Sequence, residues 1–127
     1  MRISIGTANF GNVYGLNKNK IIYKNELNKI IRYCQKNNID TIDNAQSYNK
    51  SQNLISNFPV TKFNFITKIK LSDSKKNISK KIITNDLKKT MKILRIKKFY
   101  GILSHEFYTS KKKNLEMLSI LKELKKK

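Results

Sequence analysis

Four polar side chains stand at the ends of predicted strands, where they could form one proton-donating site. Asp43, Lys68 and His105 each close an apolar, strand-like run, and Tyr48 lies in the loop after the second run. A free tyrosine has a pKa near 10, and a neighbouring ammonium lowers that pKa because it favours the phenolate. The set therefore suggests that Tyr48 is made acidic by Lys68, which Asp43 would hold charged and in place.

Each of these residues, taken singly, also has an ordinary structural explanation. An aspartate after a strand is often a turn or helix cap, and a loop tyrosine is often a packed ring. A lysine in so basic a chain is usually solvated, and a lone histidine is more often structural than catalytic. The argument for a site rests on their joint position at equivalent ends of three consecutive strands.

Apolar residues recur along the chain alternately with the period of a strand and with that of a helix, and the strands and helices so indicated must position the four residues. Leu27, Ile30, Ile31 and Cys34 have helical spacing, and Asn37-Asn38 can end that helix in a left-handed cap. We expect strands at 2–6, 39–45, 63–69 and 99–104, and helices at 24–37, 52–57 and 79–95, with a fourth carrying Leu115, Leu118, Leu121 and Leu124. Strands that alternate with helices in this way predict parallel strands joined by crossover helices.

Two architectures fit this order of elements: the doubly wound sheet and the (β/α)₈ barrel. In both, the carboxyl ends of the strands form the ligand-binding edge, so the four polar residues would converge there. A barrel usually needs about 250 residues. The length of 127 residues alone therefore favours the doubly wound sheet.

Composition excludes several classes of protein. A single cysteine, Cys34, rules out an internal disulfide framework, and His105 with no cysteine cluster leaves too few ligands for a transition-metal site. We therefore expect no metal and, for a chain with reduced thiols, the cytoplasm. No apolar run approaches the roughly 20 residues that span a bilayer, so no membrane association is expected.

The net charge of +20 raises nucleic-acid binding as the runner-up function. The basic groups are Lys75-Lys76, Lys80-Lys81, Lys88-Lys89, Lys97-Lys98 and Lys111-Lys112-Lys113, and the aromatic residues that could stack bases are Tyr23, Phe58, Phe63 and Tyr108. Lysine and asparagine codons are rich in A and T, so a low genomic G+C content would explain the charge equally well. Because no nucleic-acid-binding motif is present, nucleic acid is an unlikely partner.

Four segments carry a resemblance to the aldo/keto reductases, particularly to the bacterial branch found beside polysaccharide-synthesis genes. Residues 5–15 (IGTANFGNVYG) resemble the first βα turn of that family, and residues 39–52 (IDTIDNAQSYNKSQ) resemble its aspartate-to-tyrosine signature. Residues 65–68 (FITK) and 100–105 (YGILSH) are similar to the segments that end in its lysine and histidine. The four matches occur in the family's order and are spread over nearly the whole chain.

The resemblance implies an NADPH-dependent reduction of a carbonyl to an alcohol. Tyr48 would be the general acid, Lys68 would lower its pKa, Asp43 would pair with Lys68, and His105 would orient the carbonyl. The implied cofactor contacts are Gly6, Thr7, Ala8 and Asp43, and the implied substrate pocket includes Asn9 and Tyr14. The implied partner is a small carbonyl compound, with a sugar-related one as a candidate.

Three positions depart from the family's pattern: Asn44 replaces a threonine, Asn49 a glycine, and Gln52 a glutamate. Asn49 could keep a left-handed turn, and none of the three removes a catalytic group. The larger departure is length. The resemblance implies a (β/α)₈ TIM-type barrel truncated to its first four βα units, with residues 1–127 as the N-terminal half of a reductase domain.

A half-barrel would lack most of the cofactor site and would leave strand edges unpaired. We therefore expect a truncated or split reductase with little activity alone, completed by a separate C-terminal half or by a second copy. A non-catalytic remnant of a reductase is the third alternative.

Overall fold

The elements follow the predicted βαβαβαβα order in the computed structural model, which describes residues 3–15, 21–69, 79–105 and 108–125. They are β1 (Ser4–Gly6), α1 (Lys24–Lys36), β2 (Thr41–Asp43), α2 (Asn49–Ile55), β3 (Asn64–Ile69), α3 (Lys80–Leu94), β4 (Gly101–Ser104) and α4 (Lys111–Lys125). All four strands are shorter than predicted, β3 (predicted at 63–69) by its first residue alone, and α2 begins earlier than predicted. Ile78, which contributed to the apolar pattern of the third helix, lies outside the described residues.

The four strands form one parallel sheet in the order β1-β2-β3-β4. Gly6 pairs with Asp43, Asp43 with Ile66, and Ile66 with Gly101, so these four residues lie in one row across the sheet. Because side chains alternate between the two faces of a strand, this register determines which residues share a face.

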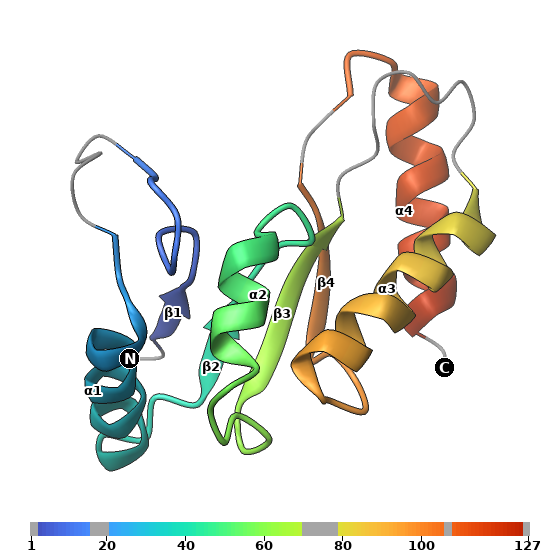
Figure 1. Ribbon diagram of the computed structural model, residues 1–127. Coiled ribbons are helices and arrows are strands. Elements are labelled where there is room, and N and C mark those ends of the chain that lie inside the picture. Colours follow the sequence, from blue (N-terminus) through green and yellow to red (C-terminus); the bar gives the residue numbers. More distant parts are fainter. Residues whose placement is uncertain (1–2, 16–20, 70–78, 106–107, 126–127) are drawn as a thin grey trace.

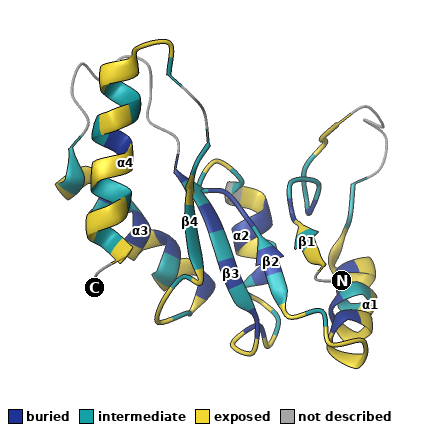
Figure 2. Ribbon diagram, turned by 180° about the vertical axis from the view of Figure 1, so that it is seen from behind, coloured by how far each residue is buried: buried dark blue, intermediate teal, exposed yellow. Residues whose placement is uncertain are grey.

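The helices cover one face of the sheet. In β3, Phe65, Thr67 and Ile69 are buried, whereas the alternate residues are only partly buried. Figure 1 shows α2 in front of the central strands, and the view from behind in Figure 2 shows the strands in front of α2. We call the uncovered side the inner face. It carries Ser4, Gly6, Thr41, Asp43, Asn64, Ile66, Lys68, Gly101 and Leu103.

Two apolar clusters lie between the helices and the sheet. The first joins α1 to the sheet through Leu27, Ile31, Ile42 and Phe65, and the second joins α3 and α4 to β3 through residues that include Ile69, Ile83, Leu87 and Met117. Cys34 is buried in the first cluster, and its burial raises the pKa of the thiol. A buried thiol with a raised pKa is typical of an unreactive core cysteine.

The connection after α1 has the conformation that the sequence predicts. Asn37 caps the helix, with its backbone N–H bonded to the carbonyls of Tyr33 and Cys34. Asn38 then takes a left-handed conformation with φ of 56°, as predicted for this Asn-Asn pair. The chain is thereby turned into β2.

This arrangement decides between the two architectures. A doubly wound sheet has helices on both faces and a reversal in strand order. Here the order is sequential and all four helices pack on the same side, as in four consecutive units of a (β/α)₈ barrel. The expectation from length alone was therefore wrong, and the four-unit half-barrel is confirmed.

Among the described helices, none has both the length and the apolar character needed to cross a bilayer. Within the same residues, no group of three or more histidine, cysteine, aspartate or glutamate side chains could hold a metal ion.

Candidate active site

Three of the four predicted site residues lie on the inner face at the carboxyl end of the sheet. Asp43 ends β2, and Lys68 lies two positions beyond the residue that pairs with Asp43, so the two share a face. His105 follows β4 directly, two positions after Leu103, which pairs with Lys68. Its backbone N–H donates to the Ile69 carbonyl at 2.8 Å, which extends the strand pairing to His105.

Asp43 and Lys68 form an ion pair across the β2–β3 boundary, in which the Lys68 ammonium donates to Asp43 Oδ1. The side chains are 32% and 23% exposed, respectively, so water still reaches both charges. This is the pairing that the sequence predicted. The opposite charges of Asp43 and Lys68 therefore largely cancel each other on the inner face.

Tyr48 lies in a short loop that is held in place by hydrogen bonds to the carbonyl of Ala45. The carbonyl of Ala45 accepts a hydrogen bond from the Tyr48 backbone N–H at 3.0 Å and another from Gln52 Nε2 at 2.8 Å. Gln52 is nearly fully buried in α2. Its amide therefore fixes the loop that brings Tyr48 from the end of β2 toward the site.

The ring of Tyr48 lies between two other rings. Its centroid is 6.1 Å from that of His105, in an edge-on arrangement at 84°, and 6.1 Å from that of Tyr14, tilted at 60°. Edge-on and tilted pairs at this spacing are favourable contacts between aromatic groups. The structure thus brings Tyr48 together with His105, as expected, and adds Tyr14 as a direct neighbour.

The pKa of Tyr48 is shifted in the direction opposite to the one expected. Burial raises it first, the neighbouring Tyr14 phenol and a side-chain hydrogen bond with that phenol raise it further, and so does the charge of Asp43. Any lowering of this pKa by Lys68, whose ammonium is paired with Asp43, is outweighed by these effects. In this structure Tyr48 is therefore a firmly protonated phenol at neutral pH.

The residues predicted to contact the cofactor divide between the two faces. Gly6 is exposed on the inner face, and an added Cβ there would meet nothing within 4 Å. Thr7 lies on the helix-covered face and is fully buried, with its hydroxyl donating to the Asp43 carbonyl and to Asn44 Oδ1. Ala8 and Asn9 are partly buried in the following loop. Thr7 therefore supports the loop after β1 and is turned away from the inner face.

The three departures from the family's pattern have different structural consequences. Asn44 is fully buried, and its Oδ1 accepts from Thr7 and from the Ala45 backbone N–H at 2.7 Å. Asn49 is the first residue of α2, and among the described non-glycine residues only Asn38 and Arg95 have positive φ. The expected left-handed turn at Asn49 is therefore wrong, because the chain enters a helix there.

The third departure, Gln52, supplies a hydrogen-bond donor that a glutamate would lack. We expect Gln52→Glu to lower the free energy of unfolding by about 1–3 kcal/mol at pH 7, because a buried carboxylate would face the Ala45 carbonyl. Urea unfolding at several pH values measures this. Burial raises the pKa of the new carboxyl, so the deficit should have its full size above the folded pKa, shrink as the pH falls toward the unfolded pKa near 4.3, and be lost below it.

Asn53→Asp is the matched control, because it makes the same amide-to-acid change at an exposed position of α2. Its effect should be within about 0.5 kcal/mol. Equal stability of the wild-type and Gln52→Glu proteins at pH 7 would show that the Gln52 amide does not hold the loop.

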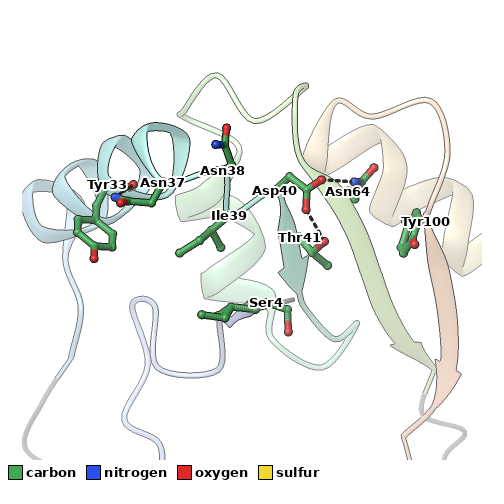
Figure 3. Close-up of a pocket in the computed structure, with 10 residues that line it drawn as sticks. Ser4, Tyr33, Asn37, Asn38, Ile39, Asp40, Thr41, Asn64 and Tyr100 are labelled. Atoms are coloured by element: carbon green, nitrogen blue, oxygen red, sulfur yellow. Dashed lines mark hydrogen bonds between the residues drawn. The ribbon is translucent and has the colours of Figure 1, made fainter. Parts of the chain in front are cut away.

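A cavity open to solvent lies at the opposite end of the strands. Its volume is about 700 Å³, and the residues that line it include Tyr33, Asp40, Thr41, Asn64 and Tyr100. Figure 3 shows Asp40 between its two partners, the Thr41 hydroxyl at 2.9 Å and Asn64 Nδ2 at 3.1 Å. None of the four predicted catalytic residues lines this cavity, so the candidate active site remains at the carboxyl edge.

The aromatic residues considered for nucleic-acid stacking do not form one platform. Phe63 is buried in the first apolar cluster, and Tyr108 packs against the second. Tyr23 is 65% exposed, beside α1. The Lys75-Lys76 pair lies outside the described residues. Within the described residues, these aromatic side chains therefore form no shared surface for stacking bases.

Comparison with known proteins concerns the family and the fold of the chain. The model of the aldo/keto reductase family matches residues 2–127. No curated protein matches the chain. Two solved structures from Pseudomonas aeruginosa, whose names assign them provisionally to the aldo-keto reductases, are similar to it with a TM-score of 0.70 each.

Sequence identity with these two structures is 17% and 18%, so the likeness concerns the fold. The matches cover 96% and 97% of this chain but 51% and 49% of the solved chains. The chain therefore spans about half the length of the structures it matches, as expected for one half of the barrel.

Proposed function

The chain belongs to the aldo/keto reductase family, and from that premise we propose that it supplies the proton-donating half of an NADP(H)-dependent carbonyl reductase. The observation that carries the proposal is the convergence of four residues on the carboxyl edge of the sheet. The Asp43–Lys68 ion pair and the Tyr48–His105 ring contact come from three strand ends and one loop. The family membership supports an oxidoreductase, and the arrangement of these residues supports the role of each.

Tyr48 acts as the general acid in this proposal. Its raised pKa keeps the hydroxyl protonated at neutral pH, so the proton is available when negative charge develops on the substrate's carbonyl oxygen. The O–H bond of Tyr48 breaks as the new O–H bond of the alcohol forms, and Tyr48 is left as a phenolate. Asp43, whose charge acts on Tyr48, is paired with Lys68, and this pairing reduces the negative charge that acts on the phenolate.

His105 orients the carbonyl in this proposal. Its Nδ1 is buried and has no hydrogen-bond partner among the described residues, while the ring meets the edge of Tyr48. A neutral imidazole carries one donor and one acceptor nitrogen. The ring can therefore present one nitrogen to a carbonyl oxygen that Tyr48 protonates, which fixes the direction of approach.

The residues present fit only part of the nicotinamide cofactor. The open inner face at Gly6 leaves room for a flat ring beside Asp43, with which Gly6 is paired. Thr7 is committed to hydrogen bonds inside the protein, and the sequence has no Gly-x-Gly-x-x-Gly or Walker loop to hold phosphates. When bound, the cofactor would supply the hydride.

Asn9 and Tyr14, in the loop after β1, are the proposed substrate-pocket residues of this chain, and a small, sugar-related carbonyl compound remains the proposed substrate class. A separate half-barrel, or a second copy, is the proposed partner that completes the site. A second copy would carry the same net charge of +20, and repulsion between the two chains opposes association at low ionic strength. The separate half-barrel is therefore the favoured partner, and the reducing cytoplasm is the proposed compartment.

We expect residues 1–127 alone to bind NADPH only weakly, because the described residues offer space for the ring but no cradle for the phosphates. Fluorescence titration with NADPH on the monomer fraction from size-exclusion chromatography tests this. The expected result is no saturation in the micromolar range and little or no carbonyl reduction. Micromolar binding with measurable turnover would refute the need for a second half.

A further inference from the structure

A row of buried polar side chains crosses the helix-covered face of the sheet, on the side opposite the ion pair. Thr7, Asn44 and Thr67 are fully buried. The Thr7 backbone N–H donates to the Asp43 carbonyl at 3.1 Å. The Asn44 backbone N–H in turn donates to the Ile66 carbonyl at 2.9 Å. These bonds continue the parallel register by one position, so Thr7 lies beside Asn44, and Asn44 beside Thr67.

The orientation of the Asn44 amide is determined by its partners. Its Oδ1 accepts from the Ala45 backbone N–H at 2.7 Å and from the Thr7 hydroxyl at 3.2 Å. A backbone N–H can only donate, so the atom that faces it must be the amide oxygen. The amide nitrogen, Nδ2, which has two hydrogens to donate, is therefore directed away from Ala45.

That nitrogen and two hydroxyls are buried without a hydrogen-bond partner among the residues that the structure describes. The three atoms are Asn44 Nδ2, Thr67 Oγ1 and Ser51 Oγ. Ser51 is fully buried in α2, next to Gln52, whose amide donates to the Ala45 carbonyl at 2.8 Å. Polar groups buried without partners are costly, and proteins commonly satisfy them with an internal water. The layer between α2 and the sheet therefore needs a ligand.

The spacing and chemistry of these atoms fit a water molecule. Neighbouring strands lie about 4.8 Å apart, and a water bonded to two polar atoms at about 2.8 Å each spans up to about 5.6 Å. Asn44 and Thr67 are neighbours in the register and share a face, so one water can reach both side chains. Because Nδ2 carries hydrogens, it cannot ligate a metal ion, whereas a water accepts from it and can donate to a hydroxyl.

We propose that Asn44 Nδ2, Thr67 Oγ1 and Ser51 Oγ bind one internal water that joins β2 to β3 beneath α2. Three partners are the usual number for a buried water. Asn44 directly follows Asp43, and Thr67 directly precedes Lys68, so the water connects the two strand ends that carry the ion pair. It helps to hold the spacing of that pair from the opposite face. This site is independent of the proposed reductase activity.

Two nuclear magnetic resonance measurements on the full chain detect such a water. The first looks for a cross-peak between water and the Asn44 side-chain amide, which is assigned through its bonds to the backbone. The sign of this cross-peak separates a bound water from exchanging protons. The second is ¹⁷O relaxation dispersion of the solvent, which counts waters held inside the protein and does not respond to exchanging hydroxyl protons.

Three variants test the ligands. Thr67→Val removes the hydroxyl and nearly keeps the shape of the side chain, whereas Thr67→Ser keeps the hydroxyl. Thr90→Val is the matched control, because it removes another buried threonine hydroxyl, one that donates to the Asp86 carbonyl in α3. We expect the cross-peak and the dispersion amplitude of one water to be lost in Thr67→Val and retained in Thr67→Ser and Thr90→Val.

Two results would overturn the proposal. The first is the absence of a water cross-peak at the Asn44 amide of the unaltered protein, and this result does not depend on whether any variant folds. The second is an unchanged dispersion amplitude in a folded Thr67→Val protein, because the water would then not depend on the Thr67 hydroxyl. Neither measurement involves carbonyl reduction, so a failure of the proposed function would leave both results unaffected.

Discussion

Tyr48→Phe is expected to lower the rate of carbonyl reduction by about 10²–10⁴, the usual contribution of a placed proton donor. The change removes one hydroxyl and keeps the ring, so the contacts with Tyr14 and His105 persist. Cofactor affinity should stay nearly constant, because the phenol acts only when charge develops on the carbonyl oxygen. The measurement is kcat and KM for a carbonyl substrate in the catalytically competent form of the protein, with NADPH binding followed separately.

Tyr33→Phe provides the control for this prediction, because it makes the same change at an exposed position on α1. It should leave kcat unchanged. Full activity of the Tyr48→Phe protein would show that Tyr48 is not the general acid. A loss of NADPH binding equal to the loss of rate would assign the hydroxyl to binding instead of proton transfer.

The raised pKa of Tyr48 gives this acid a defined pH dependence. A phenol with a raised pKa stays protonated through neutral and mildly alkaline pH, so reduction should not decline until the pH exceeds that pKa. The sequence predicted the opposite shift, because it indicated that Lys68 is near Tyr48 but not that Tyr48 is partly buried beside the Tyr14 phenol. The sign of the shift depends on this burial and on Tyr14, which only coordinates can supply.

The positions of Asp43, Lys68 and His105 could be predicted because strand periodicity is a strict geometric rule. Residues two apart on a strand share a face, and parallel strands bring their carboxyl ends to one edge. Four apolar runs separated by helical segments were enough to apply that rule. The same rule explains why Thr7, one position beyond Gly6, lies on the covered face and binds Asn44.

The contact between Tyr14 and Tyr48 could not be predicted, because both residues lie in loops that have no sequence period. Their meeting depends on the turn at Gly11, which has positive φ, and on the burial of Phe10. The signal available in the sequence was the pair of glycines around an aromatic residue, Gly11 and Gly15, which indicates a tight turn but not its direction. The start of α2 at Asn49 was missed for a related reason, since its apolar pattern begins only at Leu54.

Lys68→Met is expected to lower carbonyl reduction by about 10²-fold with little effect on folding. Lys68 neutralises Asp43, whose charge raises the pKa of Tyr48, so an unpaired Asp43 would raise that pKa further and make the acid weaker. Methionine keeps much of the apolar stem, and both partners of the pair are partly exposed. The loss in unfolding free energy should therefore stay below about 1 kcal/mol.

The readouts that identify this mechanism are kcat, the urea midpoint and the Tyr48 titration, each compared with Lys81→Met, which removes an exposed lysine of α3. The Tyr48 pKa should rise only in Lys68→Met, and the alkaline limb of the rate profile should move upward with it. A lower rate with an unchanged Tyr48 pKa would mean that Lys68 acts directly on the substrate or cofactor. Asp43 and Lys68 come from different strands. A raised Tyr48 pKa in Lys68→Met would therefore show that the acidity of Tyr48 depends on the pairing of two strands, and the size of the shift would measure that dependence.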